Sequence, residues 1–551
     1  MLAAAQRSIR LAIFAFTDQE LEEAVADALR NGIHVYVVVD VTMLDQQGRH
    51  HPVTSRRPYR IGIARLMMGV GLSNRARNRL HMAAGAVRSH SKVAFALGLA
   101  DELRNPFDTA ADCLLPGLHA SEFQQRREKL FSVLPSNSAL IVNAAETKFM
   151  THDIPYEFCQ NSNFLYLTGL EEPGAHAVLR KGKDDTCSFI LFTRPRDAHS
   201  EQWDGARLGR DGAIERYHAD DAYPLPELQP AMHKILSGLD QVFVMAPDGG
   251  KYAPAFLDAT RSFHEKFFGG NFFVEQLRLI KSESELERMR FAADIGAGGF
   301  IEMMKNTQPG MTELALASYF EASCKRNGAL WNSFPNVVGS GANAAIIHYL
   351  SKRDLLRAGE LVLVDSGCEV AGGYVSDITR TWPVGGDLSA AQRDLYEFTL
   401  DVQKRCLSHL EHQISTKQSI SLDQLHDFSV KLMVDGLQQM GVLKPSSALK
   451  GLNQSILAEF HRYNPTHIGH YLGMDVHDTP HITRGAALQP GMVITVEPGI
   501  YLPKNDQNIP NEFRGIGIRI EDDVIITATG IEVITKKVPK ELDEMEALRH
   551  A

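Results

Sequence analysis

The chain has 551 residues, of which 44% are hydrophobic and 23% charged, and its formal net charge is -10. This composition is typical of a multidomain soluble globular protein, and we expect no nucleic-acid partner. No apolar run is long enough for a transmembrane helix, and the six scattered cysteines contain no C-x-x-C pair, which argues against a disulfide framework or a thiolate zinc site.

Residues 1–45 predict a βαβ unit. An apolar run at 9–16 predicts a strand, and leucine and valine recur at a helical period within 18–32. Residues 33–40 alternate and then become fully apolar, as a buried strand does, and end in an aspartate.

This βαβ unit resembles the first such unit of phospholipase D-like hydrolases, which act through an H-x-K-x-x-x-x-D motif. Residues 90–97 supply His90 and Lys92, but Leu97 stands where the motif has aspartate. The resemblance therefore favours a degenerate or fused fragment over an active phosphodiesterase.

The next segment is strongly basic. Residues 46–100 contain ten Lys or Arg and no Asp or Glu. That composition is typical of a mitochondrial transit peptide, although its position is internal, and Met67, Met68 or Met82 could serve as an internal start. We interpret residues 46–117 as a linker or transit-like segment and expect a mitochondrial location, with the cytoplasm as the alternative.

Residues 118–278 predict a compact α/β domain. Apolar runs predict strands at 138–144, 188–193 and 241–246, and the period of apolar residues predicts a helix at 121–134. No cluster of acids or histidines occurs in this domain.

The last domain begins near Ser282, which predicts a capping box with Glu285 at the start of a long helix. Residues 339–344 resemble a G-x-G-x-x-A dinucleotide loop, but no acid-ended second strand follows at the required distance. We predict a turn there, beside the floor of the active site.

Two aspartates lie on either side of a predicted hairpin turn. Residues 360–384 predict strand, turn and strand, with the turn at 371–373. Asp365 and Asp377 are almost equidistant from Ala371, so we expect them to face each other across the strands. Two such carboxylates repel, so one must be protonated or a cation must lie between them. Alternatively, one aspartate simply ends a strand and the other caps a turn.

Three more polar residues favour the cation. Glu497 ends an apolar strand before Pro498, and Glu521 lies inside another apolar strand, where acids are rarely buried without a partner. With His470, the set becomes four carboxylates and one imidazole. Such hard ligands favour manganese, with cobalt, zinc or iron as alternatives. Four carboxylates suit two bridged divalent ions, and such pairs activate a water molecule for hydrolysis.

Several segments around these residues form an ordered series, namely IIHYLSK at 346–352, VDSGC at 364–368, VSDITRTWPV at 375–384, HIGHYLGMDVHD at 467–478, ITVEPGIY at 494–501 and GIGIRIEDDV at 515–524. Together they resemble the Xaa-Pro aminopeptidases (aminopeptidase P) of the creatinase-like, pita-bread metallopeptidases. Segments at 155–173 and 201–213 are most similar to the mitochondrial branch of that family.

The resemblance covers about residues 118–545. It implies a multidomain chain of α/β and α+β classes. An α/β N-terminal domain at 118–278 would precede a pita-bread catalytic domain at 279–551, with the βαβ fragment in front of both.

The resemblance also implies the metal ligands. Asp365 would bind one ion, Asp377 and Glu521 would bridge two divalent ions, and His470 and Glu497 would bind the second. Glu497 would in addition act as general base toward a water molecule.

Other roles follow from the same resemblance. His348 and His477 would hydrogen-bond the substrate and the tetrahedral intermediate, and Arg519 would support the acids. Trp203 and Arg207 would approach the substrate end of the cleft.

One position departs from the family pattern. Family members usually carry a histidine four residues before the ligand histidine, and here that residue is Thr466. The mitochondrial-type pattern has two adjacent histidines, of which this chain keeps only His467. The metal ligands are intact, whereas one substrate-facing proton donor is missing.

The leading interpretation is a dinuclear metal-dependent aminopeptidase that cleaves after an N-terminal residue followed by proline, in peptide substrates. Related enzymes are often dimers or tetramers, so a homo-oligomer is a further expectation. One alternative is a catalytically weakened pita-bread binding module, against which the intact ligand set argues. The other is a phospholipase D-like phosphodiesterase, against which Leu97 argues.

Overall fold

The computed structural model describes two compact units, Met1–Arg104 and Asn105–Ala551, in which the described residues are 8–12, 34–38, 112–245, 252–444 and 454–550. In the first unit, β1 (Ser8–Ala12) and β2 (His34–Val38) pair in parallel. This pairing confirms the two predicted strands. The predicted helix at 18–32, the basic segment at 46–100 and the broken motif at 90–97 lie outside the described residues.

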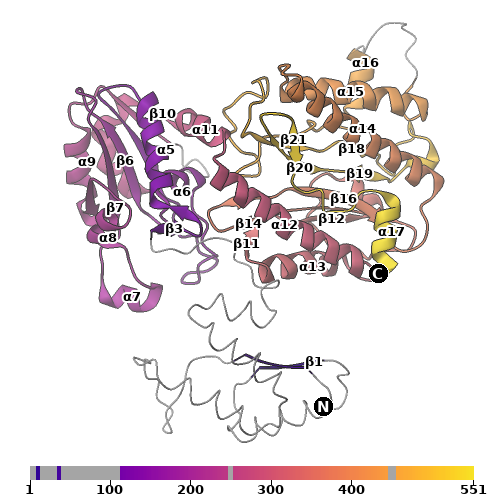
Figure 1. Cartoon of the computed structure of the whole chain (residues 1–551), viewed down its shortest axis with the longest axis horizontal. Coiled ribbons are helices and arrows are strands. Elements are labelled where there is room, and N and C mark those ends of the chain that lie inside the picture. Colours follow the sequence, from indigo (N-terminus) through magenta and orange to yellow (C-terminus); the bar gives the residue numbers. More distant parts are fainter. Residues whose placement is uncertain (1–7, 13–33, 39–111, 246–251, 445–453, 551) are drawn as a thin grey trace, which may run out of the picture. The chain divides into compact units, whose positions relative to one another are not determined.

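The second unit begins with a mixed six-stranded sheet in the order β10-β9-β5-β6-β7-β8. The strands of this part are β3 (Cys113–Leu115), β4 (Leu118–His119), β5 (Ser138–Asn143), β6 (His176–Lys181), β7 (Cys187–Thr193), β8 (Asp221–Pro224), β9 (Gln241–Val244) and β10 (Phe267–Gly269). Its helices are α5 (Ala120–Val133), α6 (Ser162–Thr168), α7 (Ala198–Asp204), α8 (Gly209–Glu215), η3 (Leu225–Glu227), α9 (Leu228–Leu236), α10 (Pro254–Thr260) and η5 (Arg261–Lys266). Helices cover both faces of the sheet, with α5 on one face and α9 on the other (Figure 1).

The central strand β5 is buried on both faces. Leu140 packs in one apolar cluster with Phe123 of α5, whereas Ala139 and Ile141 pack in a second cluster with Met232 of α9. Because successive side chains point to opposite faces, both faces must be apolar. This explains why the strand appears in the sequence as an unbroken apolar run.

The remainder of the second unit consists of small sheets covered by long helices (Figure 1). Its helices are α11 (Asn271–Leu279), α12 (Glu283–Asn306), α13 (Glu313–Arg326), η6 (Gly341–Ala345), α14 (Ala390–Ser415), α15 (Leu422–Gln439), α16 (Gln454–Phe460), η7 (Asn511–Phe513) and α17 (Leu542–His550). Its strands are β11 (Ala329–Asn332), β12 (Val337–Ser340), β13 (Leu361–Ser366), β14 (Cys368–Val370), β15 (Tyr374–Val375), β16 (Ile378–Pro383), β17 (Val493–Val496), β18 (Gly499–Tyr501), β19 (Gly517–Arg519), β20 (Asp522–Ile526) and β21 (Ile531–Val533).

The predicted capping box at the start of α12 is confirmed, because the Ser282 and Glu285 side chains each bond the other's backbone. The predicted turn at 339–344 is instead the end of β12 followed by η6, a short 3-10 helix. No helix in the described part of the chain is long and apolar enough to cross a membrane.

The sheets of this part meet where the predicted metal ligands lie. The Glu521 backbone N–H donates to the Thr379 carbonyl at 3.0 Å, and the Thr381 hydroxyl donates to the Arg519 carbonyl at 3.1 Å. These bonds join β16 to the end of β19 and to the segment between β19 and β20. The carboxylates of strands far apart in the sequence are thereby brought to one place.

Candidate metal centre

The strand register places the two predicted aspartates diagonally on one face. Asp365 of β13 pairs with Thr379 of β16, and Asp377 lies two residues before Thr379. Residues two apart in a strand point to the same face. The expectation that the aspartates lie directly opposite each other is therefore wrong by two residues, because the turn is centred on Gly372, with a φ of +96°, and not on Ala371.

The remaining ligands come from irregular backbone at strand ends. Glu521 lies between β19 and β20, and not inside a strand as expected, whereas Glu497 follows β17 directly. His470 lies on a segment beside β17, where its carbonyl accepts from the Thr495 N–H at 3.0 Å. A Cβ at Gly469 would lie 2.0 Å from the Thr495 carbonyl oxygen, so only glycine permits this close approach.

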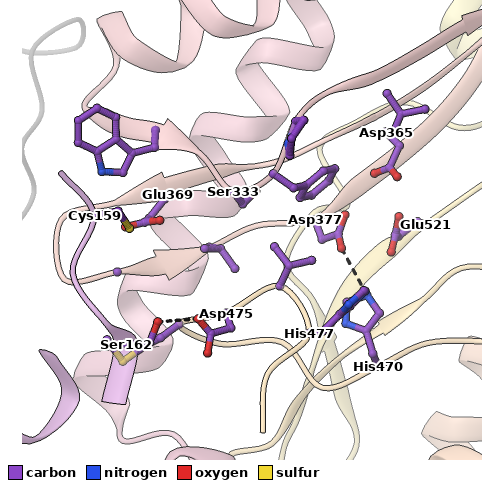
Figure 2. A pocket seen from close by; sticks show the side chains of 18 of the residues that line it. Cys159, Ser162, Ser333, Asp365, Glu369, Asp377, His470, Asp475, His477 and Glu521 are labelled. Atoms are coloured by element: carbon purple, nitrogen blue, oxygen red, sulfur yellow. Dashed lines mark hydrogen bonds and ion pairs between the residues drawn. The ribbon is translucent and has the colours of Figure 1, made fainter. Parts of the chain in front are cut away.

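These side chains converge (Figure 2). Ligand atoms of Asp377, His470 and Glu521 all lie within 4.8 Å of one another. The His470 Nε2 atom is 3.4 Å from an Asp377 oxygen and 3.5 Å from a Glu497 oxygen. Figure 2 shows the Asp365 carboxylate beside the same group. The structure thus brings all five sequence-predicted ligands together.

The acids are left in a state that a cation would relieve. One oxygen each of Asp365, Asp377 and Glu521 is buried without a hydrogen-bond partner in the described residues. Burial, followed by the charge of Asp365, raises the pKa of Asp377 well above its usual value, and burial with Asp377 does the same for Glu521. Unpaired carboxylates in such a setting are costly, so the donor set fits divalent ions.

The imidazole is held in the form that binds metal. The Nδ1 atom of His470 lies 3.1 Å from the Tyr471 carbonyl oxygen, which can only accept. We therefore assign the proton to Nδ1, which leaves the Nε2 lone pair facing Asp377 and Glu497.

Arg519 anchors the acid cluster from behind. Its guanidinium is buried and donates to Asp365 at 2.5 Å, to the Tyr501 hydroxyl at 2.6 Å and to the Thr379 hydroxyl at 2.9 Å. The Thr379 hydroxyl in turn donates to Glu521 at 2.6 Å. This arrangement fixes the orientation of two ligands and supplies a positive charge beside them, as the predicted supporting role requires.

The acids open onto a cavity of about 730 Å³, which also contains His348 and His477. The His477 ring centroid lies 4.5 Å from that of His470, at an interplanar angle of 79°. Burial, with His470 nearby, lowers the pKa of His477 to about 4, so the ring is neutral near pH 7. A neutral imidazole can donate one hydrogen bond and accept one.

Three comparisons bear on this site. Residues 287–528 match the model of Metallopeptidase family M24, and residues 123–244 match that of the Aminopeptidase P, N-terminal domain. Human Xaa-Pro aminopeptidase 3 is 38% identical over 450 residues, covering 79% of this chain and 86% of that protein. The mitochondrial intermediate cleaving peptidase 55 of Arabidopsis thaliana is 39% identical over 434 residues, covering 79% and 83%. The chain belongs to the Xaa-Pro aminopeptidases of metallopeptidase family M24.

A solved structure supports the same conclusion. Escherichia coli aminopeptidase P with the inhibitor Pro-Leu superposes with a TM-score of 0.70 at 36% identity, covering 79% of this chain and 98% of that one. The second unit therefore has the expected architecture, in which an α/β N-terminal domain precedes a pita-bread catalytic domain.

In this M24 aminopeptidase, Thr466 lines the cavity, and its buried hydroxyl oxygen has no partner in the described residues. The neighbouring His467 also lines the cavity, stacked on His426 at 4.2 Å with its Nδ1 atom 3.0 Å from the Gly469 carbonyl. These two contacts fix the position of the His467 ring.

Trp203 and Arg207 do not line the cavity. The Trp203 side chain is 78% exposed on α7, which buries none of its residues. Arg207 contacts Asp204 and the Pro195 carbonyl instead. The described chain therefore does not bring these two predicted substrate contacts to the site.

A largely buried ionic clamp beside the site was not predicted from the sequence. Arg278 donates to Asp475 at 2.7 Å and also to Asp478, and Lys281 donates to Asp478 at 3.0 Å. The Ser162 hydroxyl of the N-terminal domain donates to Asp475 at 2.5 Å. These contacts hold the residues on either side of His477. The available signal was two basic residues among apolar ones at a helix end, which indicates buried charges that need partners.

Glu369 is a second missed residue. It lines the cavity from β14, and Figure 2 shows it near Cys159, away from the metal ligands. Burial, followed by Asp475 and Glu171, raises the pKa of Glu369 to about 7. This end of the cavity is acidic, a property that the separate sequence segments do not reveal.

Proposed function

We propose that the chain removes the N-terminal residue from peptides whose second residue is proline. The convergence of five metal-binding side chains, three buried and two half-buried, along one cavity carries this proposal. We assign Asp365, Asp377, His470, Glu497 and Glu521 as ligands of two divalent ions. Manganese is the proposed metal, because four of the five donors are carboxylates.

Bound divalent ions would polarise the scissile carbonyl and acidify a water molecule. We assign the proton transfer to Glu497. Glu497 lines the cavity beside His470, and a carboxylate next to a metal-bound water is suited to accept its proton. Glu497 would accept a proton from the attacking water and return it to the proline nitrogen as the C–N bond breaks.

His348 and His477 would orient the substrate. Both line the cavity, and the His477 ring is neutral near pH 7 because burial lowers its pKa. A neutral imidazole can donate to the oxygen on which negative charge develops without first losing a proton. Arg519 would keep Asp365 in place during this change.

Selectivity for proline has a physical basis. An X-Pro bond has no amide N–H, and its ring restricts both its own φ and the preceding residue. A peptidase that binds an amide N–H would therefore lose that bond with such a substrate. The proposed site uses metal ligands and histidines, none of which needs an amide donor from the substrate.

The experiment is a comparison of two tripeptides, Ala-Pro-Ala and Ala-Ala-Ala, with the purified manganese-loaded chain. We expect cleavage of the first only, and a loss of at least roughly 100-fold in kcat for Glu497→Ala because the general base is removed. Glu512→Gln, an exposed glutamate on η7, is the matched control and should retain full turnover. Absence of cleavage with every divalent metal would overturn the proposal and favour a binding module.

We also propose a mitochondrial location. The basic, acid-free segment at 46–100 and the relative named as mitochondrial support it. The N-terminal sequence of the endogenous protein tests this: a mature chain that starts at or after Met67 supports import, and one that retains residues 1–40 argues against it.

Light scattering of the purified chain tests the expected homo-oligomer.

A further inference from the structure

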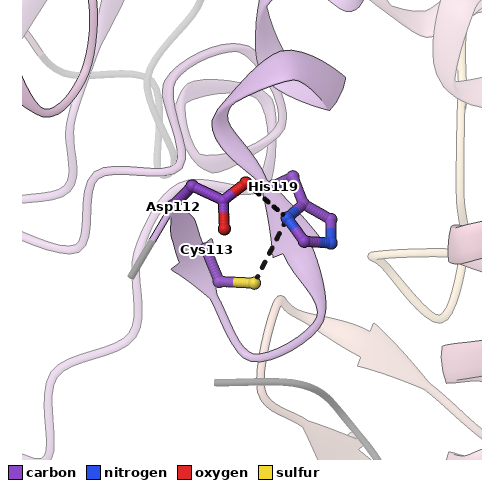
Figure 3. A group of neighbouring side chains, drawn as sticks. All are labelled: Asp112, Cys113 and His119. Atoms are coloured by element: carbon purple, nitrogen blue, oxygen red, sulfur yellow. Dashed lines mark hydrogen bonds and ion pairs between the residues drawn. The ribbon is translucent and has the colours of Figure 1, made fainter. Parts of the chain in front are cut away.

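A second group of potential metal ligands lies at the start of the second unit. Asp112, Cys113 and His119 form the only other such group of three in the described residues (Figure 3). The β3–β4 hairpin brings them together, because its register pairs Cys113 with His119. The boundary expected at residue 118 falls inside this hairpin. None of the three lines the catalytic cavity.

Both contacts in the group use the same histidine nitrogen. The His119 Nδ1 atom is 3.0 Å from an Asp112 carboxylate oxygen and 3.6 Å from the Cys113 sulfur. In a neutral imidazole, Nδ1 is either a donor or an acceptor. As a donor to Asp112, it cannot accept the Cys113 S–H. As an acceptor from Cys113, it turns a lone pair toward a carboxylate. With the Nδ1–H hydrogen on Asp112, the Cys113 sulfur can share it only as a weak acceptor, so hydrogen bonding leaves the contact to sulfur weak.

A cation at the centre satisfies all three side chains. Zinc binds sulfur at about 2.3 Å, histidine nitrogen at about 2.05 Å and carboxylate oxygen at about 2.0 Å. In a tetrahedral site, these bond lengths place the nitrogen roughly 3.5 Å from the sulfur and roughly 3.3 Å from the oxygen. The separations at His119 are 3.6 and 3.0 Å. Two of the three separations are thus close to those of a tetrahedral site, and all three ligand atoms lie within 4.8 Å of one another.

We propose that Asp112, Cys113 and His119 bind a zinc ion, with solvent at the fourth position. A sulfur ligand selects zinc over manganese, in contrast to the oxygen-rich catalytic centre. Cys113 is buried, whereas the Asp112 and His119 side chains are 70% and 45% exposed. An ion from solvent therefore has direct access, and the thiol proton leaves to solvent as the thiolate binds.

The site would fix a hairpin that touches the catalytic domain. The Pro116 carbonyl at the hairpin turn accepts a hydrogen bond from Arg288 of α12. A Cβ at Gly372 would contact Leu118 of β4 at 3.3 Å, and Gly372 lines the catalytic cavity. Zinc at this position would therefore stabilise the packing behind one wall of the cavity. The inference is independent of the proposed activity.

Cobalt titration of the metal-free full chain tests this assignment, because a thiolate ligand gives a near-ultraviolet charge-transfer band that oxygen and nitrogen ligands do not. We expect the band in the wild-type chain and its loss in Cys113→Ser and His119→Ala. Cys159→Ser, which removes the thiol that lines the catalytic cavity, and Cys187→Ser, at an exposed cysteine, should keep it. A band that is absent from the wild type, or unchanged in Cys113→Ser, would overturn the proposal.

A stability measurement covers the case in which a variant is partly unfolded. With the catalytic centre first saturated with manganese, added zinc should raise the unfolding temperature of the wild type and of Cys187→Ser, but not of Cys113→Ser. Turnover of Cys113→Ser without zinc should equal that of the wild type, which shows that the variant is folded. An equal zinc-induced shift in Cys113→Ser would contradict the site.

Discussion

Thr466 stands in the cavity where the family resemblance implies a histidine, and its hydroxyl oxygen has no partner in the described residues. We predict that Thr466→His raises kcat on an X-Pro peptide by roughly tenfold, since an imidazole supplies a proton donor that threonine lacks. Steady-state kinetics with manganese measures the change. Thr416→His, at an exposed position, should have no effect. Turnover in Thr466→His that is equal to or lower than that of the wild type would contradict the prediction that the missing histidine limits kcat.

Glu369 predicts a pH dependence of stability. Its pKa of about 7 in the folded chain lies above the usual ~4.3, so the folded state binds the proton more tightly than the unfolded state. The protonated Glu369 carboxyl stabilises the folded chain fully below pH ~4.3, and this stabilisation is lost as the pH rises through 7. The free energy of unfolding of Glu369→Gln, relative to that of the wild type, should therefore rise by roughly 2 kcal/mol between pH 4.5 and pH 8, after allowance for the partial exposure of Glu369.

Urea midpoints of the metal-free proteins at the two pH values measure this difference. Glu512→Gln, at an exposed glutamate, is again the control and should follow the wild type. A wild-type curve parallel to that of Glu369→Gln would contradict the raised pKa.

At the scale of elements, the segment that carries His477 depends on the clamp from α11. Arg278 is buried and ion-paired with Asp478, whose pKa is lowered by Arg278 and Lys281 despite its burial. Replacing Arg278 with methionine leaves Asp478 buried with one cation fewer. Loss of one partner of a buried pair costs about 3–5 kcal/mol.

We therefore predict a large loss of stability in Arg278→Met, together with a fall in kcat as the segment around His477 loosens. Arg290→Met is the matched control. Its arginine is 34% exposed and pairs with Glu532, and such surface pairs contribute about 0–1 kcal/mol. Thermal unfolding of both variants decides the point, and equal losses would contradict the clamp.

At the same scale, the sequence predicts the metal ligands but not the strand register or the ionic clamp. Strand-borne acids in apolar settings, such as Asp365 and Glu497, need partners, and the sequence therefore pointed to the metal centre. The register was missed by two residues because it depends on where the turn places its glycines, and Ala371 does not mark the centre. The clamp joins Arg278 to Asp475 across 197 positions, a pairing that only the packed fold creates.

At the scale of the whole molecule, the described catalytic centre lies entirely within Asn105–Ala551. We predict that a chain lacking residues 1–104 keeps the kcat/KM of the full chain on an X-Pro peptide within about twofold, because each assigned ligand and histidine is retained. Parallel assays of the two chains test this, and a loss of tenfold or more would show that the first unit contributes to the site.

The central claim is that five side chains hold two metal ions. Metal analysis of the dialysed, manganese-loaded chain tests it most directly, with Asp377→Asn, Glu521→Gln and the control Glu512→Gln alongside. We predict two manganese ions per chain in the wild type and the control, at most one in the other two variants, and X-Pro cleavage that follows this occupancy. One ion or none in the wild type, or two in the Asp377 and Glu521 variants, would contradict the account.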